Sequence, residues 1–143
     1  MAFDKTLILE RWDTPCSDLG YDLIFEGLVE NETGLTFSVR HEGEVYDFRF
    51  EAFGPYQVAD EAFLQAYQLD STDDSQTRKV AATPAVGNTC IVTNSDWEKS
   101  FNLDLMYGIF FESPLTHYHI STADSCLDIL TGVPPTISLR TNE

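Results

Sequence analysis

The run Leu35-Thr36-Phe37-Ser38-Val39, followed by Glu42-Gly43 and then by Glu44-Val45-Tyr46-Asp47-Phe48-Arg49-Phe50, alternates apolar with polar side chains. Successive side chains of a β-strand point to opposite faces of the sheet. One face of the second run therefore carries three aromatic residues, Tyr46, Phe48 and Phe50. The stretch predicts a β-hairpin with one buried, aromatic face.

Two further strands are predicted on the N-terminal side of this hairpin. Residues 21–29 are rich in aromatic and branched side chains, and the turn signal Asn31-Glu32-Thr33-Gly34 joins them to the hairpin. Residues 21–52 should therefore form an antiparallel meander with one face buried. A short first strand is predicted from Thr6 to Trp12.

Three helices are predicted to cover the sheet. Apolar residues from Val58 to Gln68 follow Gly54-Pro55 with helical spacing. Ser95-Asp96-Trp97-Glu98 has the form of a capping box and opens a second helix. The third should begin at Ser121 or Thr122, because the next apolar residues have helical spacing, namely Ala123, Cys126, Leu127 and Leu130.

The remaining segments complete an α+β prediction. Strands are predicted at 89–93, 115–121 and 136–139, the last at a sheet edge because Pro134-Pro135 precedes it. Residues 70–88 have little periodicity and are predicted to form a long loop or linker. The predicted fold is one α+β domain over residues 1–143, an antiparallel sheet built on the N-terminal meander and packed by about three short helices.

The charge of the chain is its most unusual property. Acidic residues number 24 against 8 basic ones, which gives a net charge of −16, while the hydrophobic fraction of 43% is high enough for a packed core. Because every phosphate contact needs a cation, we expect no binding to nucleic acid or membrane. Two explanations for the acidity stay open: solubility alone, or a surface matched to a basic partner.

The cysteines and the N-terminus indicate a soluble cytoplasmic protein. Cys16, Cys90 and Cys126 are odd in number and widely spaced, which favours buried free thiols over disulfides or a zinc site. The first residues lack the pattern of a secretory signal, and no stretch is apolar for long enough to cross a membrane. An edge strand near residue 139 would permit dimers, but the sequence leaves the oligomeric state open.

His117-Tyr118-His119 is the one pattern with metal-ligand spacing. Residues two apart on a strand share a face, so two imidazoles there, with Asp124 or Asp128 as a third ligand, would suit zinc. The alternative is a pair of hydrogen-bonded histidines that face solvent or a partner. No Gly-rich phosphate loop, no Gly-x-Ser-x-Gly and no His-Glu-x-x-His occurs. We therefore expect no cofactor, no metal and no catalytic residues.

The second half of the chain, about residues 90 to 137, resembles a known kind of protein. The stretches that carry the resemblance are Asn94-Ser95-Asp96-Trp97, residues 117–124, Leu127-Asp128-Ile129-Leu130 and Pro134-Pro135. Together they are similar to small acidic bacterial proteins, some of which are immunity proteins that neutralise toxins. The resemblance implies a protein that blocks a toxin by contact and has no catalytic residues.

These observations lead to a functional hypothesis. A non-catalytic, acidic binding protein of immunity type would neutralise a basic toxin through charge complementarity. The alternatives are an accessory protein-binding domain and a small metal-dependent enzyme that uses His117 and His119. The expected contacts are acidic residues with three aromatic anchors, namely Asp18, Asp22, Glu26, Glu30, Asp60, Glu61, Asp70, Asp73, Asp74, Trp12, Tyr21 and Tyr56.

Overall fold

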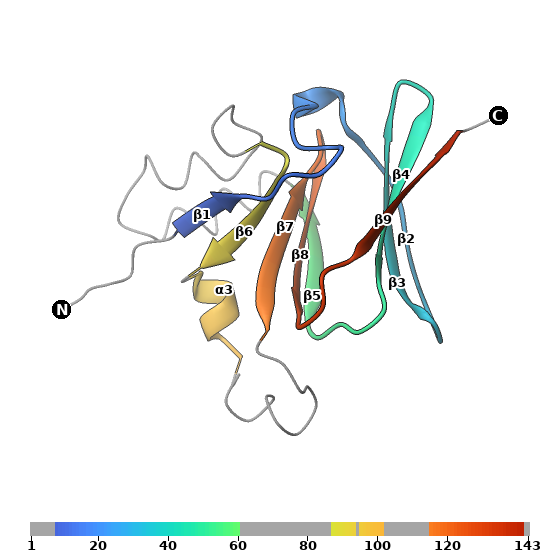
Figure 1. Ribbon diagram of the computed structural model, residues 1–143. Helices are drawn as coiled ribbons and strands as arrows, with labels where there is room; N and C mark the ends of the chain where they lie inside the picture. Colours follow the sequence, from blue (N-terminus) through green and yellow to red (C-terminus); the bar gives the residue numbers. More distant parts are fainter. Residues whose placement is uncertain (1–7, 61–86, 94, 102–114, 142–143) are drawn as a thin grey trace.

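The computed structural model describes residues 8–60, 87–93, 95–101 and 115–141, and this part of the chain is mostly β (Figure 1). Two antiparallel sheets contain its strands, with orders β2-β3-β4-β9 and β1-β6-β7-β8-β5. The strands are β1 (Ile8–Arg11), β2 (Ile24–Asn31), β3 (Gly34–His41), β4 (Glu44–Phe50), β5 (Tyr56–Asp60), β6 (Thr89–Thr93), β7 (Thr116–Ser121), β8 (Ser125–Thr131) and β9 (Thr136–Thr141).

The predicted α+β class with about three helices is wrong. Within the described residues the helical structure is limited to α3 (Asp96–Lys99) and the 3-10 turn η1 (Gly20–Asp22). None of the helices in this part of the chain is long and apolar enough to span a membrane. The fold is a pair of packed antiparallel sheets with α3 beside one of them (Figure 1).

The four-stranded sheet contains the predicted meander. β2, β3 and β4 pair in sequence, with Phe37 opposite Phe48 and Leu35 opposite Phe50. The two-residue turn Glu42-Gly43 has positive φ at both positions (52° and 86°), which matches the right-handed twist of the strands that it joins. β9 pairs with β4 and forms an edge of this sheet, as predicted.

β8 lies where the third helix was predicted. It sits between β7 and β5, and its residues Cys126 to Thr131 are all buried. A strand that is buried on both faces has a continuous apolar run, which the spacing of leucines alone does not distinguish from a helix. The hydroxyl of Thr122 accepts the amide N–H of Ser125 at 3.0 Å and so closes the β7–β8 turn instead of capping a helix.

The other two helix predictions have different outcomes. α3 begins as predicted, since the amide N–H of Glu98 donates to Ser95 Oγ at 3.0 Å. The predicted helix from Val58 overlaps strand β5, which runs to Asp60, so its start is wrong. The rest of that helix and most of the predicted loop at 70–88 lie outside the described residues.

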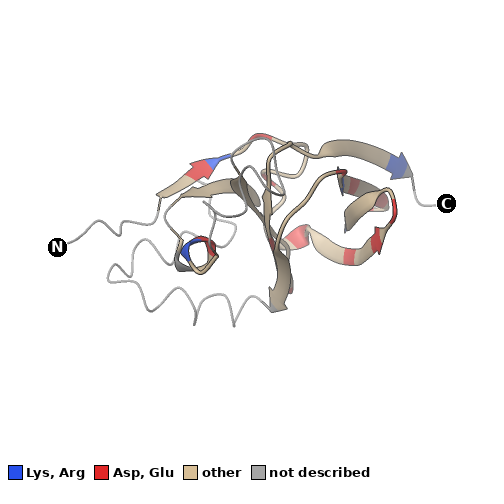
Figure 2. Cartoon of the chain, turned by 90° about the horizontal axis from the view of Figure 1, so that it is seen from below, with Lys and Arg blue, Asp and Glu red and all other residues tan. Residues whose placement is uncertain are grey.

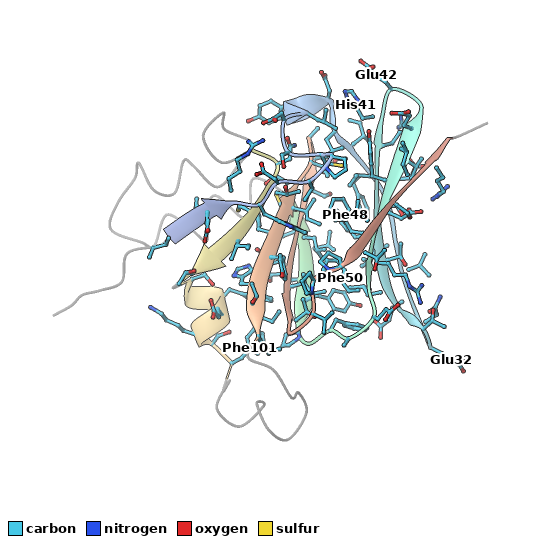
Figure 3. All side chains as sticks on the ribbon, viewed as in Figure 1. Glu32, His41, Glu42, Phe48, Phe50 and Phe101 are labelled. Carbon is cyan, nitrogen blue, oxygen red and sulfur yellow. The ribbon has the colours of Figure 1, made fainter. Side chains whose placement is uncertain are left out.

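The core lies between the two sheets. Fully buried side chains of β3 and β4, among them Phe37 and Phe48, meet Ile120 and Ile129 from the five-stranded sheet. In Figure 3 the labelled Phe48 and Phe50 point from β4 toward that sheet. Each such side chain contributes about 1.5–3 kcal/mol by leaving water. The aromatic face predicted from the hairpin sequence is therefore the centre of the core.

Candidate functional site

The five-stranded sheet carries a buried polar network on the face that points away from the four-stranded sheet. Asp128 on β8 lies opposite His119 on β7. Asp128 Oδ1 lies 2.6 Å from His117 Nε2 and 2.8 Å from His119 Nδ1. All three residues are at most 3% exposed. The two histidines therefore share one carboxylate oxygen inside the protein, whereas the sequence had suggested a pair facing solvent or a partner.

The second ring nitrogen of each histidine lies within hydrogen-bond distance of a serine hydroxyl oxygen. His117 Nδ1 lies 3.1 Å from Ser95 Oγ, and His119 Nε2 lies 2.8 Å from Ser121 Oγ. We assign to His117 the tautomer with its proton on Nε2, because that proton faces the Asp128 carboxylate. Ser95 then donates its hydroxyl proton to His117 Nδ1, while its oxygen accepts the N–H of Glu98. The network thus ties α3 to the sheet.

The charges in this network depend on each other. Burial alone would lower the pKa of His119, but the Asp128 carboxylate and its hydrogen bond raise that pKa well above its ordinary value. Burial alone would raise the pKa of Asp128, but the charge of His119 and the hydrogen bonds from both histidines lower it. We therefore describe the pair as an imidazolium and a carboxylate, with the Gln57 amide 3.4 Å from the second carboxylate oxygen.

The order Ser95, His117, Asp128 has the connectivity of a nucleophile, a base and an orienting acid. The environment of Ser95 argues against that chemistry here. Ser95 is 1% exposed and its oxygen already accepts a helix N–H, so a substrate atom has no approach to it. Within the described residues no group of three or more His, Cys, Asp or Glu side chains is arranged to hold a metal ion. The geometry supports a structural role for the network.

A second cluster of functional interest lies at one end of the two sheets. Ile24, just after η1, pairs with Arg40, so η1 lies beside the β3–β4 turn that contains Glu42. The amide of Ala123 donates to the carbonyl of Leu23 at 2.8 Å, which brings the β7–β8 turn to the same end (Figure 1). We define the acidic end as Tyr21, Asp22, Glu42 and Asp124, which are all exposed.

Within the described residues no lysine or arginine forms an ion pair with the three carboxylates of the acidic end, and His41 Nε2 lies 3.9 Å from a carboxylate oxygen of Glu42. Arg11 binds Asp18 through two hydrogen bonds of 2.8 Å, and Arg40 binds Glu26 at 2.9 Å. Figure 2 shows acidic residues spread over both sheets, with basic residues at few places. In this part of the chain, no lysine or arginine therefore competes with a cationic partner for these three carboxylates.

Asn88 holds η1, which presents Tyr21, in place. Its side-chain oxygen accepts the N–H groups of Leu19 (3.1 Å) and Gly20 (2.7 Å). Its side-chain nitrogen donates to the carbonyls of Gly20 (2.9 Å) and Ser121 (3.0 Å). All bonding positions of this buried amide are thus occupied. Tyr21 remains 62% exposed on a turn that is fixed in position.

The predicted contact residues fall into four groups. Asp22 and Tyr21 belong to the acidic end, whereas Asp18 and Glu26 pair with arginines. Other predicted contacts have partners inside the protein: the Trp12 ring lies 4.7 Å from that of Tyr118, and Tyr56 donates to Glu30 at 2.5 Å. The side chains that lie outside the described residues are those of Asp60, Glu61, Asp70, Asp73 and Asp74.

Sequence reasoning missed three residues of this region. Glu42 and Asp124 are far from residues 18–32 in the sequence and reach them only through strand pairing. The sequence indicated a turn at Glu42-Gly43, but it did not indicate that this turn lies beside η1. Asn88 gave no signal, because a single asparagine in a loop has no characteristic pattern.

Comparison of the chain with protein-family models, with curated proteins and with solved structures finds no match.

Proposed function

We propose that this chain is a non-catalytic binding protein of immunity type, which neutralises a basic protein toxin through the acidic end. The observation that supports this most directly is Tyr21, an aromatic side chain that is 62% exposed beside carboxylates that form no ion pair with a lysine or arginine of the described residues. Tyrosine supplies a large contact area with little loss of conformational freedom, and tyrosines are common among the residues that dominate binding energy.

The charge of the chain supports the same proposal. A net charge of −16 attracts cationic proteins over a distance and raises their association rate. Asn88 keeps η1 in one conformation, so little ordering is required when a partner binds. The histidine network supports no competing enzymatic proposal, because its serine is buried and engaged.

The test compares two sets of substitutions that change the charge equally. One variant carries Asp22→Asn, Glu42→Gln and Asp124→Asn, and the control carries Glu10→Gln, Glu32→Gln and Glu51→Gln at exposed positions elsewhere. Figure 3 shows Glu32 at the end of the sheet opposite Glu42. Each tagged protein is used to capture partners from its own cells at low and at high salt.

We expect wild type and the control to capture a basic protein that is lost as salt rises. The acidic-end variant should associate about tenfold more slowly or worse, and Tyr21→Ala should dissociate faster. Expression of the captured protein alone should arrest growth, and co-expression of this chain should restore it. A harmless captured protein would favour an accessory role, and equal losses in both charge variants would show that the acidic end has no special part.

A further inference from the structure

β9 is an edge strand with little of the usual protection, because its one charged side chain is Arg140. Among the strands that the structure describes, β9 pairs with β4 alone. It contains no proline and no acidic residue, whereas the other three edge strands, β1, β2 and β5, each contain at least one acid. β2 also has a bulge between Phe25 and Gly27. Prolines, charges and bulges are the usual protection of an edge against another strand.

The register defines which backbone groups of β9 remain open. The two-residue turn Glu42-Gly43 makes His41 and Glu44 a hydrogen-bonded pair, so alternate residues of β4 bond to β3. The residues between them, including Val45 and Asp47, must direct their N–H and C=O groups to β9, where they lie opposite Arg140 and Ser138. Ile137 and Leu139 therefore direct theirs away from the sheet.

We propose that β9 pairs antiparallel with β9 of a second copy of this chain, with Leu139 opposite Leu139 on a twofold axis. The two four-stranded sheets would then continue as one sheet of eight strands. Leu139 is 52% exposed and lies opposite Tyr46 on the neighbouring strand. In the dimer, Leu139 of the second copy would cover this exposed side chain. This inference is independent of the proposed function, because it uses a different surface.

Charge complementarity favours a second copy as the occupant of this edge. With Leu139 on the axis, Arg140 lies opposite Ser138 of the second copy, and Ser138 lies opposite Asp47 within each chain. Two strand spacings then separate Arg140 from Asp47 of the second copy, about 9–10 Å between Cα atoms.

Ser138 is small, so the guanidinium can extend over it toward that carboxylate. Arg140 is 57% exposed in its side chain and already bonds Asp47 of its own chain at 2.8 Å. The pairing would alternate two arginines with two aspartates across the axis. Figure 2 shows a basic band and no acidic one on the strand that leads to the C-terminus.

The first experiment measures the mass of the full chain by light scattering and sedimentation over about a thousandfold range of concentration. We expect wild type to approach twice the 16.1 kDa of one chain. Leu139→Lys should raise the dimer Kd about tenfold or more, because the two lysines would face each other. Val29→Lys is the matched control: it changes a similarly exposed residue (57%, against 52% for Leu139) on the other edge of the same sheet.

A chain that stays monomeric throughout would overturn the proposal, and so would equal dissociation of both lysine variants. A second measurement uses wild type alone and needs no variant to fold. Amide hydrogen exchange at Leu139 and Ile137 should slow as concentration rises, while that at Ser138 and Arg140, which bond to β4, should not change. Exchange at Leu139 that is independent of concentration would refute the pairing.

Discussion

The substitution Asp128→Asn tests the buried network most directly. The amide has nearly the shape of the carboxylate but removes the anion that His117 and His119 both contact, at 2.6 and 2.8 Å. Removing one partner of a buried ion pair leaves the other charge without compensation, which costs about 3–5 kcal/mol. We expect the free energy of unfolding to fall by that amount near pH 6.

The pH dependence of this loss has a definite sign. The raised pKa of His119 contributes stability that is complete below its ordinary pKa of about 6.5 and is lost as pH rises through the folded-state pKa. The lowered pKa of Asp128 contributes stability that is complete above its ordinary pKa of about 3.9 and is lost as pH falls below it. The pair therefore contributes in full between about pH 4 and about pH 6.5.

The variant should respond to pH in the opposite direction. Without the carboxylate, burial lowers the pKa of His119, so the variant loses stability as pH falls toward 5. The difference from wild type should thus be largest near pH 5–6 and smaller at alkaline pH. Urea unfolding followed by tryptophan fluorescence measures it, since Trp97 lies 5.0 Å from the His117 ring.

The matched control for this experiment is Asp124→Asn. It removes the same charge from an exposed turn, so it should change stability by less than about 0.5 kcal/mol. Two results would refute the assignment of an imidazolium–carboxylate pair. One is a fall of less than about 1 kcal/mol in the free energy of unfolding for Asp128→Asn, and the other is a dependence of that free energy on pH that runs parallel to wild type from pH 5 to 9.

Three further changes test other parts of the fold. Ser95→Ala should lower the free energy of unfolding by about 1–2 kcal/mol in urea titrations, because it removes the helix cap, whereas Ser95→Thr should retain most of it. Gly34→Ala should lower the melting temperature strongly, since φ is +139° and a Cβ would lie 2.5 Å from the Phe50 carbonyl oxygen, while Gly27→Ala, which meets nothing within 4 Å, should be tolerated. Burial raises the pKa of the Cys16 thiol to about 12, so we expect the native protein to react very slowly with a disulfide reagent and the unfolded protein to react at once.

The meander was predictable because its pattern is local. Alternation in residues 35–50 defines which side chains face inward, and the turn residues Glu42-Gly43 define the register. The N-cap of α3 was also predictable, because Ser95 and Glu98 are three residues apart and the contact between them lies within one turn. In both cases the interacting residues are neighbours in the sequence.

The predictions that failed concern features that depend on contacts between residues far apart in the sequence. Cys126, Leu127 and Leu130 have helical spacing, but β7 and β5 on either side of β8 convert the segment into a central strand. The His117–Asp128 contact depends on the β7–β8 register, so the sequence suggested a shared face without showing that it is buried. The acidic end likewise depends on pairings between distant segments.

The order of the strands has a consequence for how the chain reaches this structure. β1 pairs with β6, which places Ile8 opposite Thr93, and β4 pairs with β9, which places Asp47 opposite Ser138. Neither sheet can be completed by hairpins alone, so each must close a long segment of chain before those contacts stabilise it. All-β domains with such distant pairings fold in about milliseconds to seconds. Until β9 pairs with it, β4 is itself an open edge. In that interval the high negative charge of the whole chain would keep partly folded molecules apart.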